Sequence, residues 1–108
     1  MIAEVVTYDP VRRKGFMKRL DQPSRRGIHF ALGMLPRDFK QPVIETSRRL
    51  NRIKKMPRVP AESVFRELMD HIKGMVVGQQ FSFEAVPRED GRLVIKRKTV
   101  QHLGDSAH

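Results

Sequence analysis

The sequence predicts a mainly β domain of five strands, with one or two α-helices inserted between the third and fourth strands. Short segments alternate apolar with polar residues, and turn formers such as Asp9-Pro10 and Asp90-Gly91 separate them. One stretch, near residues 61–73, has helical periodicity instead. A length of 108 residues suits a single domain with one small core.

The first three strands are expected in the N-terminal third. Strand one should run from Ile2 to Tyr8, followed by a turn opened by Asp9-Pro10. Strand two should cover Gly15 to Leu20, and strand three should run from Ile28 to about Leu32 after a break around Pro23.

The insertion spans about residues 36–75. Its second half is predicted to be a helix from Ala61 to Lys73, with Gly74 as the C-terminal stop. The apolar residues on one side of this helix are expected to pack into the core, namely Val64, Phe65, Leu68, Met69 and Ile72. The preceding segment, Pro42 to Met56, has imperfect apolar spacing and many basic residues. It is either a solvated helix or loose loop, or a basic arm that follows a phosphate backbone.

The C-terminal part predicts a hairpin. Its first strand, Gln79 to Val86, places Phe81, Phe83 and Ala85 on one face, and its second begins at Leu93. The domain is therefore expected to cover residues 1–102. Residues 103–108 lack a packing pattern and are expected to form a disordered tail.

Charge is distributed unevenly along the chain, whose formal net charge is +10. From Arg12 to Arg58 there are 15 Lys and Arg but three Asp and Glu. The remainder of the chain carries 7 Lys and Arg and 9 Asp and Glu. Such a bias indicates a positively charged surface. A protein that binds nucleic acid, the ribosome, an anionic membrane or an acidic protein would show the same charge bias.

The second strand has a face that suits a flexible polyanion. Lys14, Phe16 and Lys18 alternate with Gly15 and Met17, so the two lysines flank one aromatic ring. The ring offers a stacking platform, and the ammonium groups attract phosphates.

Three segments resemble the cold-shock domain family, in the order that the family has them. They are Tyr8-Asp9-Pro10 with Gly15-Phe16-Met17, then Ile28-His29-Phe30, then Val77 to Glu84. The resemblance implies an oligonucleotide/oligosaccharide-binding (OB) barrel that binds single-stranded nucleic acid. Thr7, Lys14 and Gly27 depart from the family pattern, because they stand where it has aromatic residues.

We therefore expect a five-stranded OB barrel, with a helical insertion, that binds single-stranded RNA or DNA with low sequence specificity. Affinity should depend more on charge than on stacking. The residues expected at the interface are Tyr8, Phe16, His29 and Phe30 as stacking rings, and Arg12, Arg13, Lys14, Lys18, Arg25 and Arg26 as phosphate contacts.

An alternative keeps the barrel only as a scaffold. In that case the chain is a small interaction or inhibitory protein that docks an acidic protein partner or forms a homo-oligomer. The reduced set of aromatic residues favours this alternative, and the basic insertion would supply the docking surface.

Other classes find no support in the sequence. The histidines lack metal-site spacing, the serines lack a nucleophile elbow, and no glycine-rich phosphate loop is present, so we expect no enzyme, metal or cofactor. No apolar run is long enough to span a membrane, and no signal segment is visible. With no cysteine, the chain is expected to be cytoplasmic.

Overall fold

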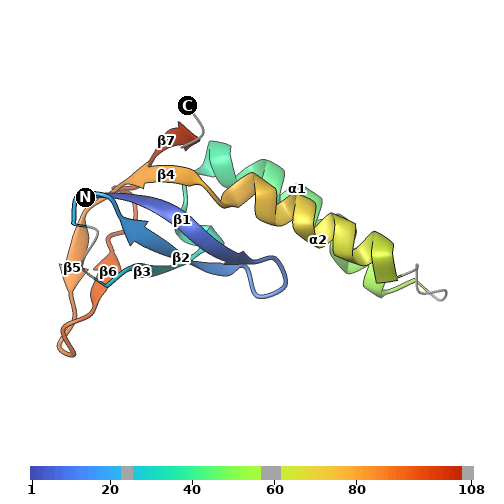
Figure 1. Ribbon diagram of the computed structural model, residues 1–108, viewed down its shortest axis with the longest axis horizontal. Coiled ribbons are helices and arrows are strands. Elements are labelled where there is room, and N and C mark those ends of the chain that lie inside the picture. Colours follow the sequence, from blue (N-terminus) through green and yellow to red (C-terminus); the bar gives the residue numbers. More distant parts are fainter. Residues whose placement is uncertain (23–25, 57–61, 106–108) are drawn as a thin grey trace.

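The computed structural model describes residues 1–22, 26–56 and 62–105. Figure 1 shows the strands at one end of the molecule and two neighbouring helices that extend toward the other. In chain order the elements are β1 (Ile2–Asp9), β2 (Lys14–Arg19), β3 (Ile28–Ala31), a 3-10 turn (Leu32–Met34), α1 (Arg37–Lys54), α2 (Glu62–Val76), β4 (Gln79–Ser82), β5 (Ala85–Pro87), β6 (Leu93–Ile95) and β7 (Gln101–Asp105).

Five strands form one antiparallel sheet in the order β3-β2-β1-β4-β7, and β5 pairs separately with β6. A mainly β fold with two helices between the third and fourth strands is confirmed. The sheet does not close into the predicted barrel, because in the described part of the chain β3 and β7 remain its two edges.

Interruptions in the last two predicted strands account for the open sheet. The strand predicted from Gln79 to Val86 is divided into β4 and β5. The strand predicted from Leu93 ends at Ile95 as β6, and β7 begins only at Gln101. Thr99 links the two breaks, since its hydroxyl donates to the carbonyl of Lys96 at 2.6 Å and accepts the N–H of Glu84 at 3.0 Å. Side-chain hydrogen bonds of this kind compete with strand pairing.

The core lies on one face of the five-stranded sheet. Ala3, Met17 and Phe81 are each 0 % exposed there. The start of α1 contributes Val43 to this core, and the end of α2 contributes Ile72. The other members of the cluster are Val5, Tyr8, Ile28, Phe30, Leu32, Leu35, Leu50, Val76, Phe83 and Ile95. Residues far apart in the sequence thus share a single core.

A β-bulge in β1 changes which side chains enter this core. Val5 pairs with Met17 and Thr7 pairs with Phe16, so Val6 is an extra residue on β1. A bulge shifts the two-residue alternation by one position. Tyr8 therefore joins Val5 on the core face, whereas regular alternation would have placed it outside.

Helix α1 is longer than predicted at its N-terminal end. Helix α1 begins at Arg37 rather than Pro42, which lies inside it, and its buried side contains Val43, Ser47 and Leu50. The segment is a helix rather than a loose loop. Pro42 costs the helix one backbone hydrogen bond.

Helix α2 also ends later than expected. Gly74 is helical, so its prediction as the stop is wrong. The helix ends at Val76, and Gly78 follows with a φ of +87°, a conformation that favours glycine. The N–H of Gly78 donates to the carbonyl of Val5 at 2.9 Å, which fixes α2 to β1.

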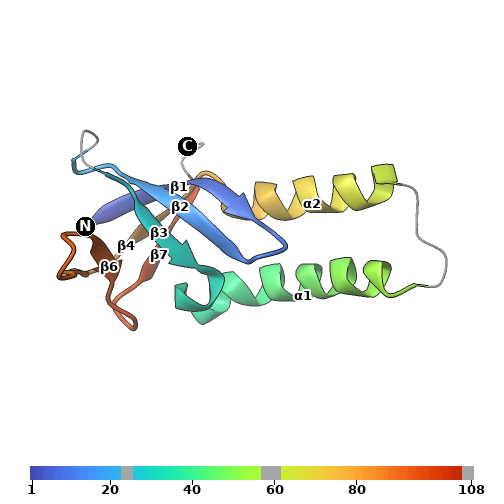
Figure 2. The same cartoon turned by 90° about the horizontal axis from the view of Figure 1, so that it is seen from below.

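Only the inner half of the helical hairpin packs against the sheet, and the outer half projects beyond it (Figures 1 and 2). Ile72 is buried in the shared core, but Phe65 is half-buried beside α1, where Lys54 Nζ lies 5.6 Å from the ring centroid. Val64 is 46 % exposed. The expected apolar stripe is thus shared between the core and the contact with α1.

The predicted disordered tail is wrong for Leu103 to Asp105. These residues belong to β7, in which Gln80 pairs with Gly104 and Phe81 pairs with His102. The His102 ring packs 5.1 Å from that of Phe81, a contact that the local sequence does not reveal. Residues 106–108 of the predicted tail lie outside the described part of the chain.

Gly15 should be required for the core. A Cβ at this position would collide with the carbonyl oxygen of Thr7 and with the Phe30 ring. Gly15→Ala should therefore lower the free energy of unfolding by about 1–3 kcal/mol, as overpacked cores do, in urea denaturation. The control is Gly74→Ala in α2, where an added Cβ meets no atom within 4 Å and should stabilise the helix by up to about 1 kcal/mol. An unchanged stability of Gly15→Ala would contradict the packing described.

Candidate functional site

The outer face of β1–β3, opposite the core, carries some of the residues predicted to form the interface. On β2, Lys14 and Lys18 are exposed and Phe16 is half-buried, whereas Met17 is fully buried on the core face. Pairing of β2 with β3 places His29 directly opposite Phe16. The alternation predicted for strand two therefore gives the correct face for Lys14, Phe16, Met17 and Lys18.

Phe16 and His29 form an aromatic pair on this face. Their ring centroids are 5.1 Å apart and the rings are inclined at 65°, an edge-to-face arrangement. The Phe16 ring covers Gly27, because a Cβ on Gly27 would overlap the ring atoms. Gly27, which interrupts the aromatic pattern of the cold-shock family, thus provides the space that Phe16 occupies.

Tyr8 and Phe30 are not on the outer face. Their exposed fractions are 4 % and 3 %, and their rings stack in the core with centroids 6.2 Å apart and an angle of 11°. The bulge at Val6 turns Tyr8 inward, and alternation along β3 places Phe30 on the side opposite His29. The expectation that four rings form one stacking surface is corrected to two.

The buried Tyr8 hydroxyl has no hydrogen-bond partner among the described residues. Burial raises the pKa of Tyr8 to about 12; the positive charge of Arg13 partly opposes this rise, and the negative charge of Asp9 adds to it. The hydroxyl is therefore neutral at physiological pH.

The basic residues of the predicted interface differ in whether they form ion pairs with acidic side chains. Lys14 and Lys18 make no ion pair within the described residues, although they lie opposite Asp9 and Glu4 across the β1–β2 ladder. In the β1–β2 turn, Arg12 Nε is 3.9 Å from Asp9 Oδ2.

The other arginines of the prediction lie in the turns. Arg13 occupies the β1–β2 turn, is half-buried and has a φ of 56°. Arg26 is exposed just before β3, and Arg25 lies outside the described residues. Only part of the predicted basic set is therefore placed around Phe16.

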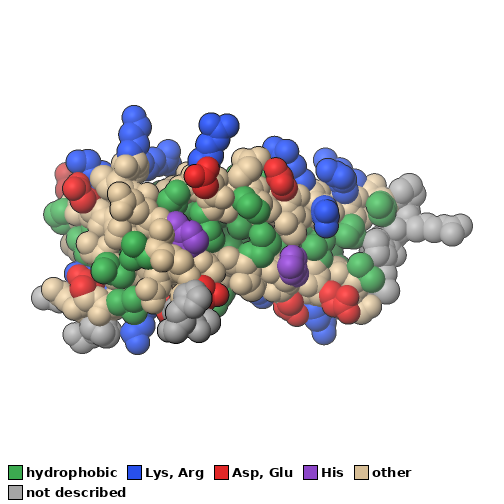
Figure 3. Space-filling model, turned by 90° about the horizontal axis from the view of Figure 1, so that it is seen from above, with side chains coloured by type: hydrophobic (Ala, Val, Ile, Leu, Met, Phe, Trp, Pro, Cys, Tyr) green, Lys and Arg blue, Asp and Glu red, His purple; other side chains and the backbone are tan. Residues whose placement is uncertain are grey.

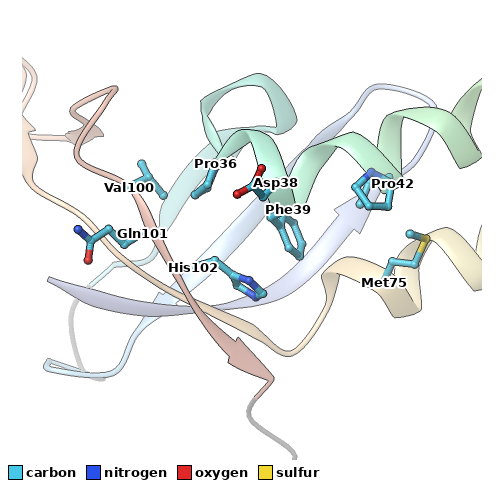
Figure 4. A pocket seen from close by; sticks show the side chains of 9 residues that line it. Pro36, Asp38, Phe39, Pro42, Met75, Val100, Gln101 and His102 are labelled. Carbon is cyan, nitrogen blue, oxygen red and sulfur yellow. The ribbon is translucent and has the colours of Figure 1, made fainter.

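Two hollows were not predicted from the sequence. One, of about 380 Å³, lies between the β1–β2 turn and α2, and is lined by Lys14 and Lys73 among others. The other, of about 700 Å³, is the groove between α1 and β7; its lining residues are Pro36, Asp38, Phe39, Pro42, Val43, Met75, Val100, Gln101 and His102 (Figure 4). We call the second hollow the α1/β7 groove.

Aromatic rings form the floor of the α1/β7 groove. The Phe39 ring lies 4.7 Å from that of His102 and 5.0 Å from that of Phe81. His102 Nε2 is 2.7 Å from Gln79 Oε1, so β4 fixes the orientation of the imidazole. Phe39 lies before the segment predicted to be helical, and His102 ends the predicted domain; no local signal connects them.

Charge divides the helical hairpin lengthwise. Helix α1 exposes Arg48, Arg49 and Arg52, whereas α2 exposes Glu67 and Asp70. Figure 3 shows Lys and Arg along one long edge of the molecule and most of the acidic side chains of the hairpin on the opposite edge. The basic segment of the sequence is thus displayed as a basic edge.

Within the described residues no three His, Asp or Glu side chains are grouped to hold a metal ion. None of the described helices is sufficiently long and apolar to cross a membrane. Comparisons with models of protein families, with curated proteins and with solved structures found no match for this chain.

The titration of Tyr8 offers a test of the core packing. Folding raises its pKa above the ordinary value of 10.0, so the neutral phenol stabilises the fold fully below pH 10, and this contribution is lost as the pH rises toward 12. Tyr8 is the only tyrosine, so tyrosinate absorbance reports it alone. In the folded protein the absorbance should appear near pH 12, and in denaturant near pH 10.

The matched control is Tyr8→Phe, whose stability should fall less than that of the unmodified protein between pH 10 and 12. Titration of the folded protein near pH 10 would mean that the hydroxyl reaches solvent, contrary to the buried position described.

Proposed function

We propose that this protein binds single-stranded RNA or DNA through the outer face of β1–β3. The observation that carries the proposal is the Phe16–His29 pair, which the core does not use and which Lys14 and Lys18 flank. Rings that are accessible on a sheet stack on bases, and nearby ammonium groups neutralise phosphates. The short aromatic set and the net charge of +10 favour charge-dominated binding with low sequence specificity.

We further propose that the fold is a relative of the OB barrel, as the resemblance to the cold-shock family suggests. Three features support this: the β1–β2–β3 meander, the antiparallel pairing of β4 with β1, and the position of β6 against β3. In this interpretation β4 and β5 together correspond to the fourth strand of the barrel, and β6 and β7 to the fifth.

A second candidate function is docking of a protein partner through the outer half of the helical hairpin. It is favoured by the exposure of Val64 and Met56, at 46 % and 51 %, in a region that does not touch the sheet. Titration of short RNA, single-stranded DNA and duplex DNA in fluorescence anisotropy distinguishes the two functions. Saturable binding of the single strands supports nucleic-acid binding, and no binding of any of them favours docking.

Replacing Phe16 should separate binding from folding. Phe16→Ala should weaken single-strand binding by about 1–3 kcal/mol, the usual contribution of base stacking, with little change in melting temperature. Phe30→Ala is the matched control, because this ring lies next along β3 from His29 but is buried; it should cost about 3–5 kcal/mol of stability. The proposal fails if Phe16→Ala unfolds the protein as Phe30→Ala does, or if it leaves affinity unchanged.

Lys14 should contribute one phosphate contact. For single strands, log affinity falls with log salt by about 0.7 for each neutralised phosphate. Lys14→Ala should lower affinity and reduce this slope by about that amount. The control is Arg66→Ala on α2, which removes an equal charge from an arginine paired with Glu62 at 3.3 Å. Equal effects of the two variants would show that only net charge matters, and would remove Lys14 from the interface.

A further inference from the structure

The α1/β7 groove combines accessible aromatic rings with a hydrogen-bonding side chain, the two features of a base-binding site. It lies away from the outer face. Figure 4 shows Phe39 of α1 and His102 of β7 side by side, with Asp38 next to them. His102 is exposed and Phe39 is half-buried, so their rings are accessible from the groove. Proline and aliphatic side chains form the remaining walls, a surface on which a planar heterocycle can pack.

Basic residues precede or follow the lining residues of the groove along the chain. Arg37 precedes Asp38 on α1 and is exposed, and Arg97 and Lys98 are exposed in the turn that leads to β7. Lys40 lies one turn along α1, and its Nζ donates to the carbonyl of Gly33 at 3.0 Å. Asp38 is the one carboxylate among the lining residues. A base with its phosphate matches this combination of rings and positive charge better than an uncharged or acidic apolar peptide does.

We infer that the α1/β7 groove binds one unstacked nucleobase of a nucleic-acid strand, at a site separate from the outer face. The inference rests on the proposed function, since it assigns a second site to the same class of ligand. The base packs against Phe39 and His102, and its phosphate lies toward the basic residues of α1 and of the turn before β7. The hydrogen bond between His102 and Gln79 holds the imidazole in place before the base arrives.

Asp38 gives the groove a preference among bases. A carboxylate accepts hydrogen bonds but donates none at neutral pH. Guanine presents its N1–H and its exocyclic amino group side by side on the Watson–Crick edge, so one carboxylate can accept both hydrogen bonds, whereas uracil and thymine offer a single N3–H between two carbonyls. The groove therefore discriminates against uracil and thymine, which the outer face, with its stacking rings and lysines, does not.

The two sites lie on different sides of the molecule. In Figure 2, β2 and β3 lie in front and β4 and β7 behind them. A mononucleotide can fill either site alone, whereas one strand reaches both only by passing around the edge of the sheet. Mononucleotides therefore allow the sites to be tested separately.

The experiment is a titration with guanosine and uridine monophosphate, followed through the NMR signals of the histidine rings. His102 reports the groove, His29 reports the outer face, and His71, exposed on α2, serves as the internal reference. Single substitutions assign the signals. Guanosine monophosphate should shift the His102 signals saturably, with an affinity about tenfold higher than that of uridine monophosphate, as expected for one additional hydrogen bond to a charged group.

Asp38→Asn is the matched variant, since its amide can also donate to the carbonyl of uracil. It should reduce the preference for guanosine over uridine toward one while the His102 signals still shift. Equal affinities for both nucleotides in the unmodified protein would overturn the role of Asp38.

The other outcomes are distinguishable. If the His29 signals shift and the His102 signals do not, the groove is not a base site and the proposed outer-face function stands. If only His102 shifts, the groove proposal holds and the outer-face proposal falls. If neither shifts, both fall. If the His102 signals change with protein concentration without nucleotide, a second copy of the chain occupies the groove and the inference is wrong.

Discussion

The extra residue at Val6 determines how the sheet uses its aromatic side chains. It reverses the alternation of β1, so that Tyr8 packs on Phe30 inside the core while Thr7 faces outward beside Phe16. Gly15 permits this packing because it leaves room for the Phe30 ring. Phe16 and His29 remain on the outer face because they alternate with the buried Met17 and Phe30 along β2 and β3.

The helical hairpin places most of the basic side chains of the insertion on α1 and most of the acidic ones on α2. Basic residues concentrate on α1, whereas α2 exposes acidic residues beside Arg66 and Lys73, so the positive charge of the hairpin lies mainly along the α1 edge (Figure 3). The connection of α2 to β1 through Gly78, together with the burial of Val43 and Ile72, fixes this orientation relative to the sheet. The hairpin thus positions charge in addition to closing the core.

Structural features that depend on residues adjacent in the sequence could be predicted from the sequence. Alternation gives the correct face for Lys14, Phe16, Met17 and Lys18, since successive side chains of a regular strand point to opposite sides. The Asp9-Pro10 turn forms as expected, with Asp9 Oδ1 accepting the N–H of Val11 at 2.9 Å. Helical periodicity likewise predicts most of α2.

The sequence by itself therefore determined the mainly β class, the helical insertion and the outer position of the Phe16 face, because each follows from local periodicity. Only the tertiary structure decided that Tyr8 is buried, that the last strands are interrupted, and that Phe39 meets His102. A bulge, a strand break and an aromatic contact across 63 residues depend on the partner strand or helix, and that partner is not encoded within a local window.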